Sequence, residues 1–266
     1  MMNPLIHQAS VGFYGIEAHE VCVDYNGTVA LYDASLKLQS GSICGLVGMN
    51  GAGKSTFFKA LMGFVRPSRG SIRINGSAVH LAQRDQAVAY VPQNEGIDCS
   101  FPVSVWDVVM MGRYGSMNFL RIPRASDKQA VWHALERVEL LELRNRPIGY
   151  LSGGQRKRAF LARAIAQRAS VLLLDEPFSG VDVRTEKLMS QLFIQFRKEG
   201  RTILISTHDL SHVREFCDLV VLINKTVLAY GKTSQIFTSE NLTMTFGGMP
   251  PDLLSGPGLP EGFSND

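Results

Sequence analysis

The residues from Gly48 to Ser55 have the types and the spacing of a loop that holds phosphate. They match the pattern GxxxxGK[ST] and directly follow the apolar run Ile43 to Val47. Glycines in such a loop let successive backbone N–H groups point at one anion, and the start of the next helix adds positive potential. Lys54 would reach the outer phosphates of a nucleotide, and Ser55 would ligate Mg²⁺. The alternative is a glycine-rich turn that fits by chance, which the preceding strand disfavours.

Two carboxylates follow a second apolar run, Val171 to Leu174. Asp175 would hold the Mg²⁺ shell through water, and Glu176 would polarise the water that attacks the phosphate. Taken alone, this stretch is equally well explained as an ordinary acidic end of a strand. Together with the phosphate loop, it favours nucleotide hydrolysis.

The elements that must position these groups alternate between short apolar runs and longer helical patterns, which is typical of parallel strands joined by helices. The strand candidates are Ile43 to Val47, Val171 to Asp175, Thr202 to Ser206 and Leu219 to Asn224. Near the N-terminus, Ser35 to Leu38 alternates polar and apolar residues, and Gly70 to Ile74 ends at the turn dipeptide Asn75-Gly76, so we expect an antiparallel edge there. The sequence therefore predicts an α/β fold with a mixed sheet.

Composition limits the remaining possibilities. The 266 residues are 45% hydrophobic and 19% charged, as in ordinary globular proteins, and the net charge of +3 is too small to argue for nucleic acid. No run reaches the roughly 18 apolar residues of a membrane span, and no secretory signal is visible. The four cysteines form no CxxC pair, so we expect neither a disulfide nor structural zinc. The Gly- and Pro-rich residues 248–266 predict a mobile tail.

Two further motifs, Leu151-Ser152-Gly153-Gly154-Gln155 and Ser206-Thr207-His208-Asp209, complete a pattern with the phosphate loop. In this order, the three motifs resemble the ABC ATPase family, in which LSGGQ is the signature sequence. The resemblance covers about residues 17–247. It implies a P-loop NTPase (RecA-like) core with a mixed sheet, an N-terminal antiparallel β subdomain and a helical subdomain inserted at about residues 94–160.

Several residue roles are implied only by this resemblance. Tyr25 occupies the place of the aromatic ring that stacks on adenine, and Gln93 that of a glutamine that contacts Mg²⁺ or water and relays the nucleotide state to a membrane subunit. His208 resembles the switch histidine that contacts the γ-phosphate and holds Glu176. Asp182 corresponds to an aspartate that acts across the dimer, although its stretch departs from the more frequent SALD.

The cofactors expected from these motifs are ATP and Mg²⁺. The residues expected to contact the nucleotide are Tyr25, Gly48, Asn50, Gly51, Gly53, Lys54, Ser55, Thr56, Gln93, Ser152, Gly153, Gly154, Gln155, Asp175 and Asp182. Those expected to act in hydrolysis are Glu176, His208, Lys54 and Gln93. The ligands expected for Mg²⁺ are Ser55, Gln93 and Asp175.

Other interpretations stay open at this point. His208 and His212, four residues apart, could form a zinc pair, but no HExxH and no third ligand accompany them. A soluble ABC ATPase acting on DNA or ribosomes is the rival from another class. The basic run Arg156 to Arg158 could suggest nucleic acid, yet on a helix it is more often a solvated face, so we expect no nucleic-acid partner.

The cargo is addressed only by likeness to a subfamily. The stretch from Phe101 to Val105 and on to Met111-Gly112-Arg113-Tyr114-Gly115 is similar to bacterial importers of manganese, iron or zinc, with Arg113 and Tyr114 as the expected surface contacts. The resemblance implies a head-to-tail dimer of this chain, integral-membrane permease subunits, and a periplasmic or lipid-anchored metal-binding protein. It places the chain peripherally at the cytoplasmic face of the bacterial inner membrane. Mn²⁺ or Fe²⁺ is favoured; zinc, haem, siderophores or export remain alternatives.

Overall fold

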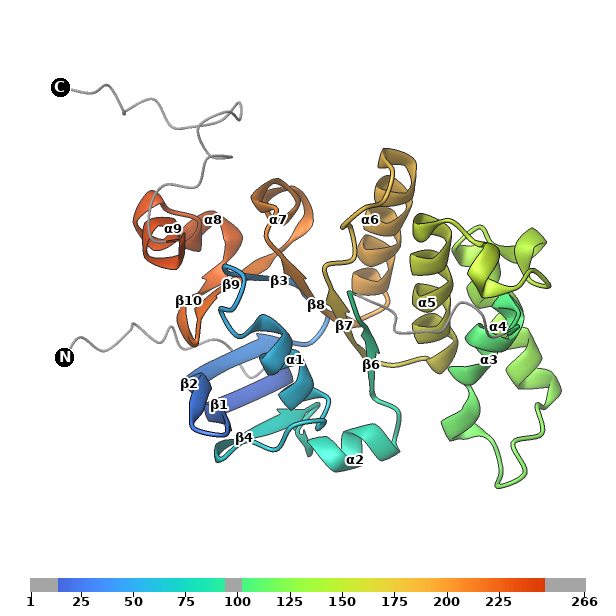
Figure 1. The fold of residues 1–266 in the computed structure, drawn as a ribbon, viewed down its shortest axis with the longest axis horizontal. Helices are drawn as coiled ribbons and strands as arrows, with labels where there is room; N and C mark the ends of the chain where they lie inside the picture. The colour runs from blue at the N-terminus through green and yellow to red at the C-terminus, as the bar shows by residue number, and fades with distance from the viewer. Residues whose placement is uncertain (1–13, 94–101, 247–266) are drawn as a thin grey trace.

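The computed structural model describes residues 14–93 and 102–246, which form two sheets accompanied by helices (Figure 1). The smaller sheet has the order β2-β1-β4-β5, and each neighbouring pair is antiparallel. Its strands are β1 (Tyr14–Tyr25), β2 (Thr28–Gln39), β4 (Arg69–Ile74) and β5 (Ser77–Ala78). The predicted N-terminal antiparallel subdomain is confirmed, although β2 is much longer than the stretch that predicted it.

The larger sheet has the order β10-β9-β3-β8-β7-β6, and it is parallel except where β10 pairs with β9. Its strands are β3 (Ile43–Val47), β6 (Val88–Val91), β7 (Val171–Asp175), β8 (Thr202–Thr207), β9 (Leu219–Asn224) and β10 (Thr226–Lys232). All residues of β3, β7 and β8 are buried, as expected for parallel strands covered on both faces. The predicted mixed sheet is therefore confirmed.

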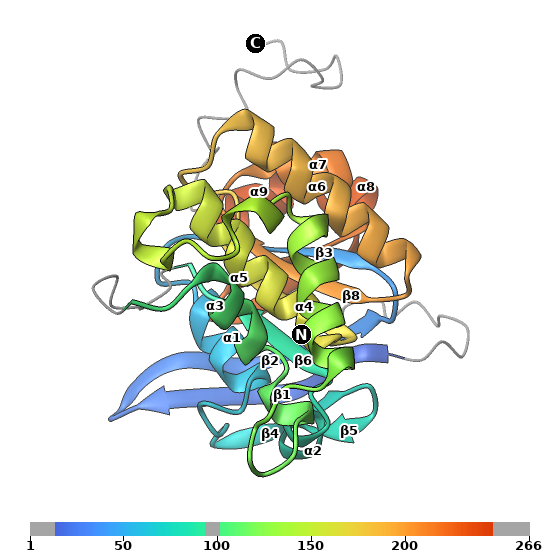
Figure 2. The same cartoon turned by 90° about the vertical axis from the view of Figure 1, so that its right-hand side faces the viewer.

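The helices lie between and after these strands. They are α1 (Lys54–Leu61), α2 (Val79–Arg84), α3 (Val105–Met111), α4 (Ala125–Arg137), α5 (Gly153–Gln167), α6 (Val183–Lys198), α7 (Leu210–Phe216), α8 (Thr233–Ile236) and α9 (Ser239–Phe246), with the 3-10 turns η1 (Tyr114–Ser116), η2 (Leu141–Leu143) and η3 (Ile148–Tyr150). Helices α3, α4 and α5 lie together at the right of Figure 1 and face the viewer in Figure 2. These helices form the inserted helical region that the sequence predicts.

Each strand of the larger sheet sends alternate side chains into two separate cores. In β7, for example, Leu172 and Leu174 join one core, while Val171 and Leu173 join the other. The first core includes the buried residues of α3 to α7, and the second includes those of α1 and of the smaller sheet. Helices α1 and α5 therefore lie on opposite faces of the larger sheet.

An ion pair between Arg113 and Asp127 joins the end of α3 to the start of α4. Arg113 Nε lies 3.1 Å from Asp127 Oδ1, and the two side chains are only 11% and 5% exposed. Arg113 also donates to the carbonyl of Ala166 in α5 at 2.9 Å. The expectation that Arg113 is a surface contact is therefore wrong, because its charge holds the helical region together. Tyr114 is half-buried against the same core.

Some predictions fall outside the described residues, including the mobile tail at 248–266 and the start of the stretch leading to α3.

Cys22, Cys44 and Cys217 are free thiols. Burial, with a smaller effect of Asp218, raises the pKa of the Cys217 thiol to about 12. Among the described residues, no helix has the length and apolar character needed to cross a bilayer.

The buried pair of Arg113 and Asp127 should make part of the free energy of unfolding sensitive to acid. Burial alone would raise the pKa of Asp127, but the Arg124 backbone N–H and the Arg113 guanidinium outweigh burial and lower it. Asp127→Asn should reduce the free energy of unfolding by about 3 kcal/mol at neutral pH. Because the folded pKa lies below the ordinary value of about 3.9, this stabilisation is present above that pH and is lost as pH falls through the folded pKa.

The measurement is urea unfolding of both proteins from pH 7 downward. Asp85→Asn is the control, since Asp85 pairs with Arg84 at 3.3 Å where both side chains are more than half exposed, and its loss should cost under about 0.5 kcal/mol. Equal losses in the two variants would contradict the structural role of the Arg113 to Asp127 pair.

Candidate nucleotide-binding site

The phosphate loop leaves the carboxyl end of β3 in a backbone shape that needs glycine at defined positions. Gly51 has φ 82° and Gly53 has φ 94°, the left-handed region that residues with a Cβ rarely adopt. A Cβ on Gly53 would also meet Leu31 Cδ2 of β2 at 2.6 Å, and one on Gly48 would meet the Ile223 carbonyl at 2.3 Å. The loop is therefore pressed between β2 and the end of β9.

Lys54 opens α1 and turns its ammonium group back over the loop. Its Nζ donates to the carbonyl of Gly48 at 2.7 Å and to that of Met49 at 3.2 Å. Burial lowers the pKa of Lys54, while the carboxylates of Glu176 and Asp175 act in the opposite direction. Beside it, Gly51 has free space where a Cβ would stand, and the first N–H groups of α1 have no partner within their own helix. These features fit a phosphate group.

Asp175 ends β7 within a network of hydroxyl groups. Ser206 donates to Asp175 Oδ1, Tyr90 donates to Oδ2 at 3.1 Å, and Ser55 Oγ lies 3.4 Å from the same Oδ2. Burial, followed by the charge of Asp175, raises the pKa of Tyr90, so that its hydroxyl keeps its proton. Carboxylate and hydroxyl oxygens are the donors that Mg²⁺ prefers. The Ser55 and Asp175 set therefore fits this ion.

Glu176 is buried at the start of the turn after β7. Its backbone has φ 49°, an unusual value for a residue with a side chain. Its N–H is shared between the Ser206 carbonyl at 3.1 Å and the Ser206 Oγ at 3.0 Å. Its carboxylate lies 2.9 Å from His208 Nδ1, and the His208 side chain is 66% exposed. Ser206 therefore fixes the backbone of Glu176, and the exposed His208 imidazole contacts its carboxylate.

The alternative of a zinc pair is not supported. His208 precedes α7, whereas His212 lies within it. The His212 Nε2 forms a hydrogen bond with Glu186 of α6 at 2.8 Å, and its Nδ1 lies 3.2 Å from Asp209. The His212 ring also packs on Phe178, with 4.7 Å between ring centroids. No group of three metal-ligating side chains occurs among the described residues. His212 instead ties the segment after β8 to α6.

The signature motif forms the N-terminus of α5. Ser152 caps the helix: its Oγ accepts the Gln155 N–H at 3.2 Å, and the Gln155 side chain accepts the Ser152 N–H at 3.0 Å. Gly153 has open space around it, and Ser152 is exposed. This helix start, with accessible backbone donors, suits an anion. It lies on the face of the larger sheet opposite α1.

The remaining predicted residues surround this core. Asp182 caps α6 by accepting the Thr185 N–H at 2.9 Å, and the Thr185 backbone and hydroxyl donors lower its pKa. Tyr25 is 41% exposed at the end of β1, on the hairpin whose second strand contacts Gly53. Gln93 is exposed two residues after β6. Asn50 is exposed in the loop, and Thr56 is half-buried in α1.

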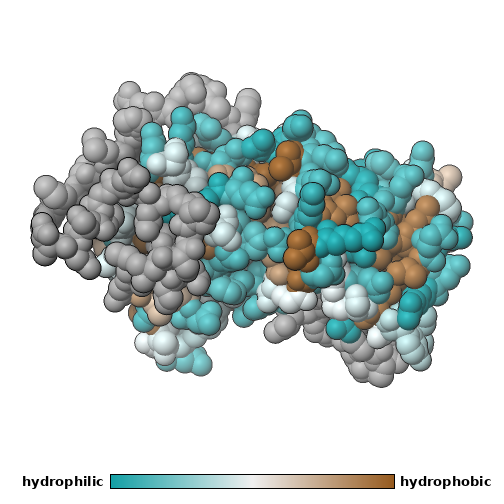
Figure 3. All heavy atoms as spheres, turned by 90° about the horizontal axis from the view of Figure 1, so that it is seen from above, coloured by the Kyte–Doolittle hydropathy of each residue, from teal (hydrophilic) through white to brown (hydrophobic). Residues whose placement is uncertain are grey.

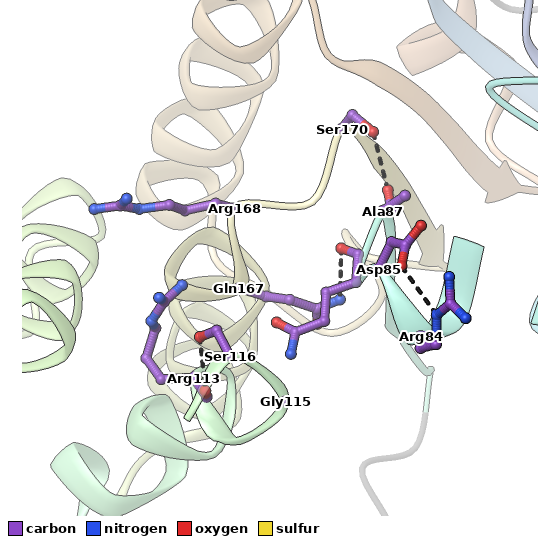
Figure 4. Close-up of a pocket in the computed structure, with 10 residues that line it drawn as sticks. Arg84, Asp85, Ala87, Arg113, Gly115, Ser116, Gln167, Arg168 and Ser170 are labelled. Carbon is purple, nitrogen blue, oxygen red and sulfur yellow. Dashed lines mark hydrogen bonds and ion pairs between the residues drawn. The ribbon is translucent and has the colours of Figure 1, made fainter. Parts of the chain in front are cut away.

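A cavity of about 490 Å³ lies elsewhere, between the end of α5, η1 and the residues that lead into β6 and β7 (Figure 4). Gln167 borders it and donates to the Gln86 and Val88 carbonyls. Ala87 and Ser170 directly precede β6 and β7, so the cavity is at the amino ends of these strands. The phosphate loop and Glu176 follow carboxyl ends, and the cavity is therefore separate from the nucleotide site.

On the face drawn in Figure 3, the coloured surface is mostly hydrophilic and carries separate apolar patches. The basic run on α5 is not a solvated face as expected: Lys157 donates to the Glu176 carbonyl at 3.2 Å, and Arg158 donates to the Val138 carbonyl at 2.8 Å. These two cations therefore bind backbone carbonyls of neighbouring segments.

Comparison with known proteins agrees with this site. The family model described as ABC transporter matches residues 31–179, more than half of the chain. The chain is 56% identical over 243 residues to the manganese transport system ATP-binding protein MntA of a Synechocystis species, covering 91% of this chain and 94% of that one. It is 57% identical over 230 residues to the chelated iron transport system membrane protein YfeB of Yersinia pestis, covering 86% and 78%.

A solved structure of a metal-chelate type ABC transporter in an inward-facing conformation superposes with a TM-score of 0.78 at 32% identity, covering 88% of this chain and 89% of that one. The chain belongs to the ABC transporter family. As an ATPase of this family, it hydrolyses ATP to power transport, which confirms the activity that the motifs predicted.

Sequence reasoning missed two side chains that complete the site. Ser206 belongs to a motif in which only the histidine has an implied role, and Tyr90 belongs to an ordinary strand pattern. Only strand register reveals them, because Ser206 pairs directly with Asp175 and Tyr90 lies on the neighbouring strand β6.

Removal of the Ser206 hydroxyl should affect both stability and catalysis. Ser206→Ala takes one donor from the buried Asp175 carboxylate and one acceptor from the Glu176 N–H, so the free energy of unfolding should fall by about 2 kcal/mol. The kcat for ATP should fall more than ATP affinity, because Glu176 loses a fixed partner. Urea unfolding and steady-state ATPase assays measure both. Ser116→Ala, at an exposed hydroxyl, is the control. Equal stability and equal kcat in Ser206→Ala and Ser116→Ala would contradict the role of Ser206.

Proposed function

We propose that this chain binds MgATP between the phosphate loop and the residues after β7 and β8. Lys54 and the N-terminus of α1 hold the outer phosphates, and Ser55, Asp175 and Gln93 hold Mg²⁺, which neutralises charge on the phosphates when it is bound. Glu176 accepts a proton from the attacking water, and His208 orients the Glu176 carboxylate. The supporting observation is the meeting of Lys54, Asp175 and Glu176 at one edge of the sheet.

We further propose that two copies close head to tail, with each ATP between the phosphate loop of one copy and Ser152 to Gln155 of the other. The opposite placement of α1 and α5 within one chain supports this arrangement, because a γ-phosphate on α1 needs its second set of donors from another molecule. Asp182 lies at the start of α6, beside Gly154 of the signature helix. Hydrolysis removes the γ-phosphate that joins the copies and lets them separate.

The cargo proposed for the assembled transporter is a transition metal, with Mn²⁺ and Fe²⁺ ahead of Zn²⁺. The likeness to MntA and YfeB over most of the chain supports this choice, and a relative named zinc transport system ATP-binding protein TroB, from Treponema pallidum, is 37% identical over 97% of this chain and 95% of its own length. Membrane permease subunits and an external metal-binding protein complete the proposed system, and the chain would attach to the cytoplasmic face of the inner membrane.

Glu176→Gln tests the hydrolysis site. The variant should bind ATP with wild-type affinity, because the phosphate loop is unchanged, and its kcat should fall by at least about 100-fold, because the amide accepts no proton. Nucleotide binding by fluorescence and phosphate release measure the two properties. Glu142→Gln, at an exposed carboxylate, is the control. Turnover near the wild-type rate in Glu176→Gln would overturn the assignment.

Uptake of ⁵⁴Mn, ⁵⁵Fe and ⁶⁵Zn in metal-starved cells tests the cargo. Deletion of the chain should abolish accumulation of ⁵⁴Mn or ⁵⁵Fe, and wild type should restore it. Lys54→Ala should not restore it, since the phosphate contact is lost. Loss of ⁶⁵Zn uptake alone would make Zn²⁺ the cargo in place of Mn²⁺ and Fe²⁺. Unchanged uptake of all three ions would exclude their import by this system.

A further inference from the structure

Lys157 connects the signature helix to the turn that carries Glu176. It lies in the second turn of α5, two residues after Gln155, and it is half-buried. Its ammonium donates to the carbonyl of Glu176 at 3.2 Å and to the carbonyl of Ser179. These two carbonyls stand at the two ends of one tight turn, because the Ser179 N–H also donates to the Glu176 carbonyl at 3.2 Å. Lys157 therefore clamps this turn from outside.

The clamped turn is one that needs support. Glu176 has φ 49°, and such a conformation persists only where the surrounding contacts hold it. The N–H of Glu176 is fixed by Ser206, and its carbonyl is fixed by Lys157 and by the turn itself. A cation adds a charge-assisted hydrogen bond, which is stronger than one between neutral groups. Without Lys157, the Glu176 carbonyl would be held, among the described residues, only by the weaker hydrogen bond from the Ser179 N–H.

A second contact joins the same two segments a few residues further on. A Cβ at Gly154 would lie 3.3 Å from Thr185 Oγ1 and 3.5 Å from Asp182 Oδ2, so the starts of α5 and α6 touch. Asp182 lies three residues after Ser179 and caps α6. The first turns of α5 thus contact the segment from Glu176 to Asp182 at Glu176, at Ser179 and at Asp182.

We propose that Lys157 is a positioning residue for ATP hydrolysis, which holds the backbone of Glu176 in its left-handed conformation and links the carboxylate to the signature helix of the same chain. In the proposed dimer, that helix binds the nucleotide of the other copy. A shift of α5 on closing would therefore reach the Glu176 carboxylate of its own site through one side chain. The inference rests on the proposed role of Glu176 in hydrolysis.

Lys157→Met tests the inference in the full-length chain, with and without its co-purified membrane subunits. The methionine keeps the length and the packing of the stem but removes the donor. The kcat should fall about ten-fold or more, while the KM for ATP changes less than about two-fold, because the phosphate loop is untouched. Lys157→Arg, which restores a cation, should recover most of kcat. Lys187→Met, at an exposed lysine of α6, is the matched control and should behave as wild type.

The outcomes separate this inference from the function on which it rests. A Lys157→Met protein with wild-type kcat, or one whose KM rises as much as its kcat falls, would overturn the positioning role, as would a loss that arginine does not recover. Glu176→Gln is assayed in parallel: if it is inactive while Lys157→Met is fully active, only this inference fails. If Lys157→Met does not fold, Lys157→Gln replaces it, and equal kcat values for glutamine, arginine and lysine would overturn the proposal.

Discussion

The register of three parallel strands is the constraint on which the rest of the site depends. Ser206 pairs with Asp175 on one side and with Leu46 on the other. This pairing brings the ends of β3, β7 and β8 to one edge of the sheet, where the phosphate loop, Glu176 and His208 follow them directly. The buried hydroxyl of Ser206 then ties the two carboxylate-bearing residues together. A shift of one residue in β8 would turn this hydroxyl to the other face of the sheet.

The separation of the two cores by the larger sheet also has a consequence for function. The sheet separates α1, which begins at the phosphate loop, from α5, which begins at the signature motif. In the proposed function, these two motifs of one chain are half-sites, and they face different surroundings. In the proposed dimer, both copies would be needed for a complete site, and hydrolysis would have a mechanical effect, because loss of the γ-phosphate would remove the ligand that the copies share. Lys157 adds a link between the half-sites inside each chain.

The sequence predicted what depends on local pattern and on motif spacing. The strands β3, β7, β8 and β9 were predicted because they are short apolar runs of strand length. Arg113 was misplaced because its charge suggested the surface, whereas its partner Asp127 comes from another helix. Ser206, Tyr90 and Lys157 act through contacts between segments distant in sequence, and such contacts depend on register and packing rather than on residue type.

The most direct test of this account is the size of the Glu176→Gln protein with and without MgATP, measured by sedimentation or light scattering. With hydrolysis blocked, ATP should persist between two signature motifs and two phosphate loops. The account predicts a dimer that forms with ATP, fails to form with ADP, and is lost when Ser152 is replaced by a bulky acidic residue. A protein that stays monomeric at saturating MgATP, or a dimer indifferent to nucleotide, would contradict it.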